Sequence, residues 1–146
     1  MDSLVYPEGF RHRFPVQVRW GDMDAFGHVN NAKYLTYLEM ARIDYSTSLW
    51  QRSRERGLII AKIGIEYKLP LFAGDDVHVF TRTVRIGNRS FETEQWIMRR
   101  EAEELQIAAQ AFVTIVVYDY SANQSAPIPD AWRAAIRAFE TKAPSE

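Results

Sequence analysis

The sequence predicts an α+β fold in which one long helix packs against an antiparallel sheet. Residues 32–56 contain neither glycine nor proline and repeat their apolar side chains at helical spacing. Segments before and after this stretch alternate apolar and polar residues, as half-buried strands do. Short turns join the later segments, which favours antiparallel neighbours.

The first predicted strand covers residues 14–20, where apolar residues alternate with Pro15, Gln17 and Arg19. A loop rich in glycine, aspartate and asparagine follows at residues 21–31, and Asn30 or Asn31 is a natural helix N-cap. The helix is predicted from about residue 31 to the low fifties, roughly 30 Å in length, with Gly57 ending it. Its expected buried stripe consists of Tyr34, Leu38, Ala41, Tyr45 and Leu49.

Four more strands are predicted at residues 59–69, 77–86, 90–100 and 105–117. In the first of them, Ile59, Ala61, Ile63 and Ile65 are expected on one face. Gly87-Asn88 indicates a hairpin between the second and third. A short C-terminal helix is predicted at residues 130–140. The result is a five-stranded antiparallel sheet whose concave face buries the long helix.

Length and composition limit the classes of function. A chain of 146 residues suits one domain, residues 1–146, and 47% hydrophobic with 25% charged residues is ordinary for a globular protein. A net charge of −1 argues against nucleic-acid binding. There is no apolar run of bilayer length and no signal-peptide pattern, so we expect no membrane association and a cytoplasmic location. The absence of cysteine excludes a thiol nucleophile and a disulfide scaffold.

A metal site is not expected. The three histidines do not form a His-x-x-His or His-Glu-x-x-His pattern, and no cysteine is available as a ligand. His12 and His78 are interpreted as surface or strand residues without a catalytic role.

The loop before the long helix carries the densest group of polar residues, among them Asp22, Asp24, His28 and Asn31. A helix N-terminus offers unpaired N–H groups and a partial positive charge, which suit a developing oxyanion. A neighbouring carboxylate can act as a general base or a nucleophile. The loop therefore fits an acyl-transfer hydrolase. Asp24 could instead be a turn residue, and Asp22 fits a scaffold role as well as a site role.

The segment at residues 20–35, Trp-Gly-Asp-Met-Asp-Ala-Phe-Gly-His-Val-Asn-Asn-Ala-Lys-Tyr-Leu, resembles the 4-hydroxybenzoyl-CoA thioesterase family of hot-dog proteins. Residues 37–42 resemble its central helix, and the strand order extends the resemblance from about Val16 to Tyr118. The resemblance implies a hot-dog fold and hydrolysis of an acyl-CoA thioester, with no cofactor because coenzyme A is part of the substrate.

The resemblance also implies roles for individual residues. Asp24 matches the family's catalytic carboxylate, and the backbone N–H of Asn31 is expected to point at the thioester carbonyl. Some relatives carry a histidine at the position of Asn31, whereas this chain has His28 three residues earlier, for which a supporting role near the substrate is expected. A related clade uses a helix glutamate, but here Glu39 is interpreted as an ion-pair partner, for example of Arg42.

Coenzyme A carries phosphates, and in the family the hairpin after the second post-helix strand often binds them. That hairpin contains Asn88, Arg89 and Ser90, which are the expected contacts, with Lys62 and Lys68 as further candidates.

An exposed strand edge favours pairing with a second copy. The resembled family pairs two units with each site between their helices, so a homodimer or homotetramer is expected. A hot-dog dehydratase would need an Asn-Pro element between its Asp and His, and the sequence has none. The alternatives that remain are an acyl carrier protein thioesterase and a non-catalytic acyl-CoA-binding module. The sequence leaves the acyl group open.

Overall fold

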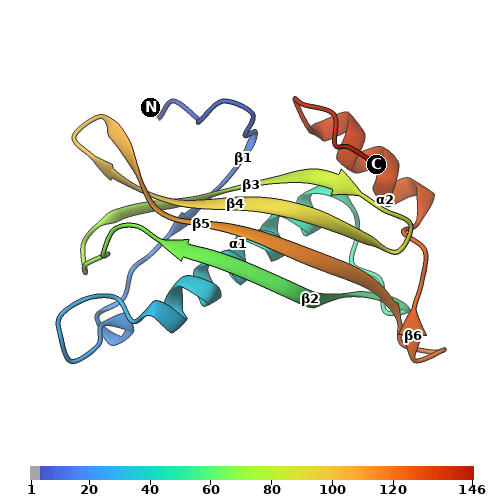
Figure 1. The fold of residues 1–146 in the computed structure, drawn as a ribbon, viewed down its shortest axis with the longest axis horizontal. Coiled ribbons are helices and arrows are strands. Elements are labelled where there is room, and N and C mark those ends of the chain that lie inside the picture. The colour runs from blue at the N-terminus through green and yellow to red at the C-terminus, as the bar shows by residue number, and fades with distance from the viewer. Residues whose placement is uncertain (1–3) are drawn as a thin grey trace.

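The structure is a computed structural model and describes residues 4–146. Six strands form one antiparallel sheet with the order β1-β3-β4-β5-β2, and the short β6 pairs with β5 (Figure 1). The elements follow the chain as β1 (His12–Val16), η1 (Trp20–Asp22), α1 (Asn31–Leu49), β2 (Arg56–Tyr67), β3 (Asp76–Ile86), β4 (Ser90–Glu101), β5 (Glu104–Asp119), β6 (Gln124–Ser125) and α2 (Asp130–Phe139). This confirms the predicted α+β fold and adds the two-residue β6, which was not expected.

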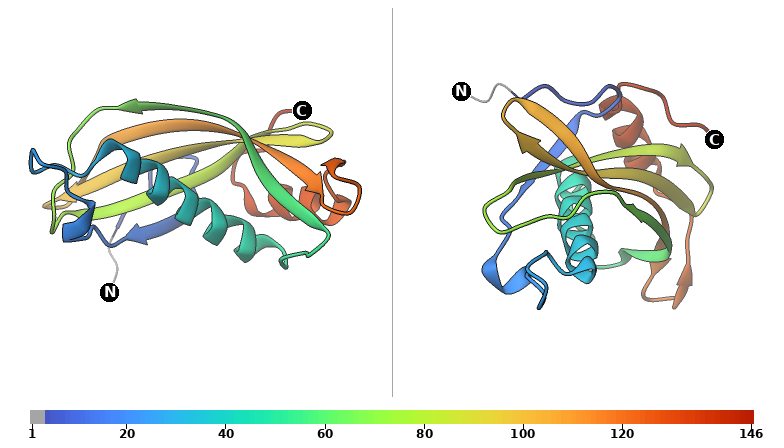
Figure 2. Two further views of the ribbon diagram at one scale, coloured as in Figure 1. Left: turned by 90° about the horizontal axis from the view of Figure 1, so that it is seen from below. Right: turned by 60° about the vertical axis from the view of Figure 1, so that its left-hand side comes forward.

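Helix α1 runs along one face of the curved sheet (Figure 2). Its buried residues are Tyr34, Tyr37, Leu38, Ala41 and Tyr45, four of which belong to the predicted stripe. Opposite them lie valines, isoleucine and alanines of β3, β4 and β5, and together these residues form the main core: Val77, Val79, Ile97, Ala109 and Ala111. Burial of this apolar face is the main contribution that holds helix and sheet together.

Helix α1 ends at Leu49, earlier than predicted, and Gly57 does not end it because Gly57 lies inside β2. Three consecutive hydroxyl residues in the last turn donate to carbonyls of the preceding turn. Thr47 donates to Ile43 at 2.8 Å and Ser48 donates to Tyr45 at 2.7 Å. Such bonds compete with the helix ladder, and Trp50 then takes an extended conformation.

The first strand also differs from the prediction. β1 ends at Val16, and Trp20 belongs to a 3-10 turn with a side chain that is 83% exposed. The alternation of apolar and polar residues therefore continues beyond the end of β1, but it does not predict that Trp20 is buried. β1 lies at the sheet edge beside β3, which suits Pro15 because an edge position does not require its missing N–H.

β2 carries a bulge that the alternating pattern did not reveal. Ile60 pairs with Ile115 and Lys62 pairs with Thr114, so Ala61 has no partner in β5. Because a bulge adds one unpaired residue, the alternation of side chains between the two faces of the strand is offset by one residue across it. Ile59 thus lies on the face opposite Ile63, which corrects the prediction that they share one.

The N-terminal residues cover part of the outer face of the sheet. Phe10 lies 4.8 Å from the ring of Trp96 and 6.1 Å from the ring of Phe80, and the Arg82 guanidinium sits 4.6 Å from the Phe10 ring. These residues form a second apolar cluster on the side away from α1. The arrangement explains why β3 is apolar on both of its faces.

Helix α2 closes the end of the molecule at which α1 finishes. The rings of Trp50 and Trp132 stack at 4.7 Å with an angle of 8°, and Ile136 is fully buried against β4 and β5. Helix α2 covers residues 130–139, so the predicted C-terminal helix is confirmed to within one residue.

Candidate functional site at the start of helix α1

The loop between η1 and α1 folds as a tight hairpin around Asp24. Met23 bridges to Val29, the N–H of Asp24 donates to the carbonyl of His28 at 2.7 Å, and Gly27 closes a turn onto the carbonyl of Asp24. Gly27 has a φ of +86°, a conformation that glycine adopts without steric penalty. The turn therefore places Asp24 opposite His28, beside the segment that leads into α1.

The Asp24 carboxylate uses one oxygen to hold this loop. Its Oδ1 accepts hydrogen bonds from the backbone N–H of Phe26 at 2.8 Å and from that of His28 at 3.3 Å. Within residues 4–146, no group donates to Oδ2. The side chain is half-exposed. The carboxylate is therefore oriented by its own turn, while one oxygen remains available for chemistry.

The first turn of α1 also leaves a donor available. Asn30 is the N-cap, and its side-chain oxygen accepts from the N–H of Ala32 at 2.9 Å. The N–H of Asn31 has no acceptor in the part of the chain that the structure describes, while its carbonyl accepts from the Tyr67 hydroxyl at 3.0 Å. A free N–H at a helix N-terminus can polarise a carbonyl oxygen.

Asp22 supports the loop from within. It is 8% exposed and accepts from the Tyr37 hydroxyl at 2.6 Å and from the N–H of Arg19 at 3.0 Å. Burial alone would raise the pKa of Asp22, but the hydrogen bonds from Tyr37 and Arg19 outweigh it, and the pKa is lowered. Of the two roles considered for Asp22, the geometry fits the scaffold.

His28 takes part in the loop mainly through its backbone. Its ring lies 5.3 Å from the ring of Phe72, and within residues 4–146 no hydrogen bond involves its ring nitrogens. The half-buried ring thus borders the loop without contacting the Asp24 carboxylate through a side-chain hydrogen bond.

The expected coenzyme A contacts lie at the other end of the molecule. The hairpin with Asn88, Arg89 and Ser90 joins β3 to β4 at the end where α1 finishes (Figure 1), whereas Asn31 lies at the start of this helix, which is about 28 Å long. The Arg89 guanidinium donates to the carbonyl of Ser125 at 2.6 Å and so holds β6 against the hairpin. One chain by itself therefore does not bring these residues to Asp24.

A cavity of about 820 Å³ opens beside the second half of α1. Its walls come from α1, the following loop, β2, the central strands and α2, and include Trp50, Trp132, Phe91 and Ile115. Arg52, Arg54 and Arg56 lie around it. Sequence analysis did not identify this cavity, although the spacing Arg-x-Arg-x-Arg directly after the helix is a visible signal of positive charge.

One residue of α1 in the wall of this cavity, Arg42, does not make the ion pair that was expected from the sequence. Arg42 does not pair with Glu39: its guanidinium donates to the side-chain oxygen of Gln95 at 3.1 Å, and within residues 4–146 no carboxylate lies at ion-pair distance from it. Burial lowers the pKa of Arg42, and the charge of Glu39 opposes that shift only in part.

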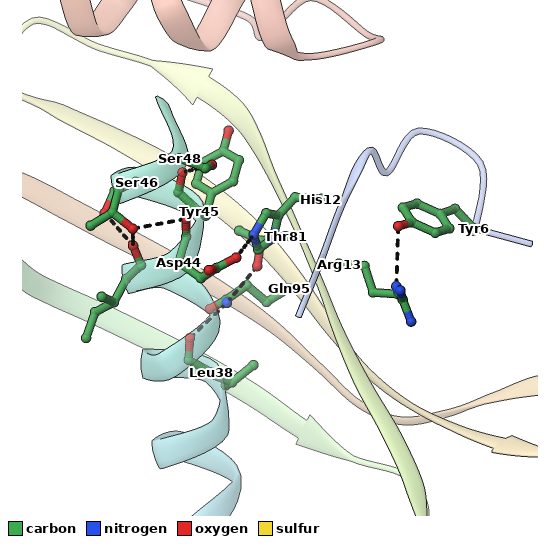
Figure 3. A network of polar contacts seen from close by, with 12 residues as sticks. Tyr6, His12, Arg13, Leu38, Asp44, Tyr45, Ser46, Ser48, Thr81 and Gln95 are labelled. Carbon is green, nitrogen blue, oxygen red and sulfur yellow. Dashed lines mark hydrogen bonds and ion pairs between the residues drawn. The ribbon is translucent and has the colours of Figure 1, made fainter. Parts of the chain in front are cut away.

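Beyond the cavity, buried polar groups join α1 to β1, β3 and the C-terminal segment. The Tyr45 hydroxyl donates to the Glu140 carboxylate at 2.5 Å and contacts the Thr83 hydroxyl at 2.8 Å. His12 contacts Asp44 at 2.7 Å (Figure 3). Both His12 and His78 are strand residues, which was one of their two expected placements, but each is buried and neither lies on the surface.

The described part of the chain contains no cluster of metal ligands. Across residues 4–146, no group of three or more histidine, aspartate or glutamate side chains is arranged to hold a metal ion. None of the helices in that range is long and apolar enough to span a bilayer.

Comparisons with known proteins agree with the fold. Residues 18–136 match the thioesterase-like superfamily. The long-chain acyl-CoA thioesterase FadM of Escherichia coli is 28% identical over 114 residues, which cover 75% of this chain and 85% of that protein.

Two solved structures are similar over most of the chain. A thioesterase of Thermus thermophilus, solved with coenzyme A and Zn, is 34% identical with a TM-score of 0.81, covering 93% of this chain and 98% of that one. The PA2801 protein of Pseudomonas aeruginosa is 31% identical with a TM-score of 0.78, covering 86% and 97%. The superfamily is broader than the 4-hydroxybenzoyl-CoA thioesterase family that the motif resembles, so the narrower assignment stays a prediction. This chain belongs to the thioesterase-like superfamily.

Proposed function

We propose that this protein hydrolyses acyl-CoA thioesters at the loop between η1 and α1, with Asp24 as the reacting carboxylate. Its family makes it a thioester hydrolase, and the names of FadM and of the coenzyme A complex support acyl-CoA as the substrate class. The assignment to this loop rests on two groups that have no partner in the described chain. They are one carboxylate oxygen of Asp24 and the N–H of Asn31 at the start of the helix.

The proposed chemistry uses the two groups in complementary ways. The N–H of Asn31 and the helix N-terminus stabilise the negative charge that develops on the thioester oxygen. Asp24 either attacks the carbonyl carbon, forming a mixed anhydride and releasing the thiolate of coenzyme A, or takes a proton from an attacking water. His28 supports this arrangement by holding the turn through its backbone. No group other than the coenzyme A of the substrate is required.

Single-turnover hydrolysis in ¹⁸O-labelled water tests for attack by Asp24 followed by opening of the anhydride at the Asp24 carbonyl. If Asp24 activates water, the label enters the released acid in the first turnover. If Asp24 attacks and the anhydride is opened at the Asp24 carbonyl, the label enters the protein, which mass spectrometry of the Asp24 peptide detects.

We further propose that two copies pair through β2. This strand is an edge of the sheet, and Ile59, Ile60 and Tyr67 on it are exposed. Unpaired edges with exposed apolar residues favour association. The start of β2 lies beside the end of α1, whereas its last residue, Tyr67, bonds to Asn31 at the helix start.

Antiparallel pairing of two β2 strands around a twofold axis has a direct geometric result. The Arg56 end of one copy lies against the Tyr67 end of the other, so the cavity of one chain faces the Asp24 loop of its partner. The hairpin with Asn88, Arg89 and Ser90, and the arginines at the cavity, then reach the same loop. In this arrangement the arginines and the hairpin bind the phosphates of coenzyme A.

The first experiment is thiol release from a panel of acyl-CoAs by the wild type and by Asp24→Asn. Asp130→Asn is the matched control, because it alters an exposed aspartate in the first turn of α2. Turnover that is lost only in Asp24→Asn supports the proposal. Binding of acyl-CoA without turnover would favour a non-catalytic binding module, and turnover only of acyl carrier protein thioesters would favour that alternative.

A subunit-mixing experiment tests the shared site. We expect Asp24→Asn and the double variant Arg52→Ala/Arg54→Ala each to show low activity alone. Mixed dimers then contain one site with both defects and one site with neither, so mixing should restore activity. Failure of mixing to restore activity, or a fully active monomer in light scattering, would contradict the proposed dimer.

A further inference from the structure

Tyr37 joins the body of helix α1 to the base of the Asp24 loop. Its side chain is 3% exposed, and its hydroxyl donates to a carboxylate oxygen of Asp22 at 2.6 Å. Tyr37 lies seven residues after the N-cap Asn30, which is about two helical turns, and it belongs to the main core. The bond therefore anchors the loop to a part of α1 that is held firmly by packing.

Asp22 carries this link on to the start of the helix. Its Oδ2 atom also accepts from the N–H of Arg19 at 3.0 Å, and its main-chain carbonyl accepts from the N–H of Asn30 at 2.8 Å. Tyr37, Asp22 and Asn30 therefore form a closed circuit with the first two turns of α1. Buried polar networks whose members are all bonded hold a structure in one arrangement, since each contact limits its neighbours.

Both reacting groups are attached directly to this circuit. Asp24 lies two residues after Asp22, and Asn31 lies one residue after Asn30. A change in the position of Asp22 relative to the helix would therefore alter the separation between the Asp24 carboxylate and the N–H of Asn31. Such a change matters for the reaction, because a misplacement of about 1 Å can lower a rate by about 10²-fold.

The bond between Tyr37 and Asp22 keeps its donor and its acceptor in the required protonation states. Burial raises the pKa of Tyr37, and the hydrogen bond to Asp22 raises it further. The same bond helps to lower the pKa of Asp22 against the effect of burial. Tyr37 is therefore a neutral donor and Asp22 a charged acceptor near neutral pH. A charge-assisted bond of this kind is roughly twice as strong as one between neutral groups.

We propose that Tyr37 is a positioning residue of the thioesterase reaction, which acts through Asp22 to hold the two reacting groups at their working separation. This inference rests on the proposed function, because Asp24 and Asn31 are the groups that Tyr37 would position. The hydroxyl of Tyr37 is bonded to Asp22 and acts on the reacting groups from a distance. Its loss should therefore weaken stabilisation of the transition state more than binding of the substrate.

Tyr45 provides a matched control on the same helix. It is 2% exposed, lies on the buried face of α1 as Tyr37 does, and donates its hydroxyl to a carboxylate, that of Glu140, at 2.5 Å. Tyr45 belongs to the other half of the helix, away from the Asp24 loop. If the role of Tyr37 were only structural, Tyr37→Phe and Tyr45→Phe would both lower the melting temperature and leave the kcat of the folded protein unchanged.

The test compares the two variants and the wild type in thiol release from acetyl-CoA, palmitoyl-CoA and benzoyl-CoA. Rates are expressed per folded molecule, and circular dichroism gives the folded fraction. Tyr37→Phe should lower kcat by about 10- to 100-fold with little change in KM, because the lost bond positions groups that act in the transition state. Tyr45→Phe should keep the kcat of the wild type. A wild-type kcat in Tyr37→Phe, or an equal loss of kcat in both variants, would overturn the proposal.

A double-mutant cycle tests whether Tyr37 acts through Asp22. Asp22→Ala removes the acceptor, so adding Tyr37→Phe to it should cause no further loss of kcat. Losses that multiply would show a different route and would overturn the proposal. Asp22→Asn is the alternative if Asp22→Ala does not fold. It replaces the charged acceptor with a neutral one, so Tyr37→Phe should have a smaller effect in that background than in the wild type.

Amide hydrogen exchange follows the loop without turnover. The N–H of Asn30 donates to the carbonyl of Asp22 at 2.8 Å, and the N–H of Asp24 donates to that of His28 at 2.7 Å. Tyr37→Phe should speed exchange in a peptide that covers residues 20–32, and Tyr45→Phe should not. Unchanged exchange of this peptide in Tyr37→Phe would overturn the proposal.

The outcomes separate this inference from the proposed function. An inactive Asp24→Asn together with a wild-type kcat in Tyr37→Phe refutes the positioning role and leaves the proposed function intact. Full turnover by Asp24→Asn, or no turnover by the wild type, refutes the proposed function. The exchange measurement then still decides whether Tyr37 fixes the loop.

Discussion

The two ends of helix α1 use polar residues in opposite ways. At the start, one oxygen of Asp24 and the N–H of Asn31 are left without partners in the described chain, in a loop that is largely exposed. Toward the other end, Tyr45, Thr83 and Glu140 bond to one another in the interior. Open hydrogen-bonding groups are available for chemistry, whereas satisfied buried groups hold the structure in one arrangement.

This difference suggests a division of roles along a single helix. Changes at the start should affect activity more than the free energy of unfolding, and changes at Tyr45 should do the reverse. Four predictions test the division, and they run from the largest expected effect to the smallest.

The largest effect is expected from Asp24→Asn. Loss of the reacting carboxylate should lower kcat by about 10²–10⁴-fold if Asp24 acts as a general base. The amide oxygen can still accept from Phe26 and His28, so the melting temperature should change little. Thiol release and thermal unfolding of the same preparation check both parts. A variant that loses activity only in proportion to its loss of folded protein would contradict the division.

Tyr45→Phe should produce the reverse result. It removes a buried donor and leaves the Glu140 carboxylate without this hydrogen bond, which should lower the free energy of unfolding by about 1–3 kcal/mol. Activity per folded molecule should remain near that of the wild type. Tyr118→Phe serves as the control, because the Tyr118 hydroxyl bonds at 2.7 Å to Asn123 in an exposed position. Urea unfolding of both variants measures the difference.

Gly27→Ala examines the loop without altering a polar group. A Cβ at this position meets no atom within 4 Å, but the φ of +86° is unfavourable for alanine. The expected destabilisation is about 1 kcal/mol. Because the strain falls on the turn that orients Asp24, kcat should decrease while KM changes less. An unchanged kcat in Gly27→Ala would contradict the role of this turn in orienting Asp24.

The smallest effect concerns pH. Burial lowers the pKa of His12, and the contact with Asp44 opposes the shift only in part. The unfolded chain therefore takes up this proton first, and the stability contributed by neutral His12 is complete above pH 6.5 and declines as the pH falls below that value. His78 shifts in the same direction. His12→Gln should flatten the decline below pH 6.5 in chemical unfolding, and an unchanged slope would exclude His12 as its source.

Much of the fold was predictable because its signals are local. The strands predicted at residues 77–86 and 90–100 agree to within one residue with β3 and β4. The Asp-x-Asp loop was identified because its turn, its N-cap Asn30 and its carboxylate lie within ten residues of sequence. The identification of Asp24 as the reacting group remains a prediction until turnover is measured.

The features that escaped prediction depend on distant residues or on one extra residue. Tyr45 and Glu140 are separated by 95 positions, so no sequence window contains both. The Thr93 hydroxyl is notable only because it is buried without a hydrogen-bond partner in the described chain, which a sequence does not show. The early end of α1 had a local signal in Ser46, Thr47 and Ser48, whose hydroxyls favour carbonyls of the preceding turn. Because the apolar residues keep helical spacing as far as Leu49 and no glycine or proline follows before Gly57, the sequence nevertheless favoured a longer helix.

The unpaired Ala61 marks the position at which the length of β2 is least restricted. Many positions of this strand are exposed and should accept substitution. Deletion of Ala61, however, would join Ile60 to Lys62 in a continuous alternation and leave Leu58 and Ile60 on the same face as Ile63, with their partners in β5 unchanged. Insertion or deletion among the paired residues would instead shift the register, so descendants of the protein should vary the length of β2 at the bulge and not elsewhere in the strand.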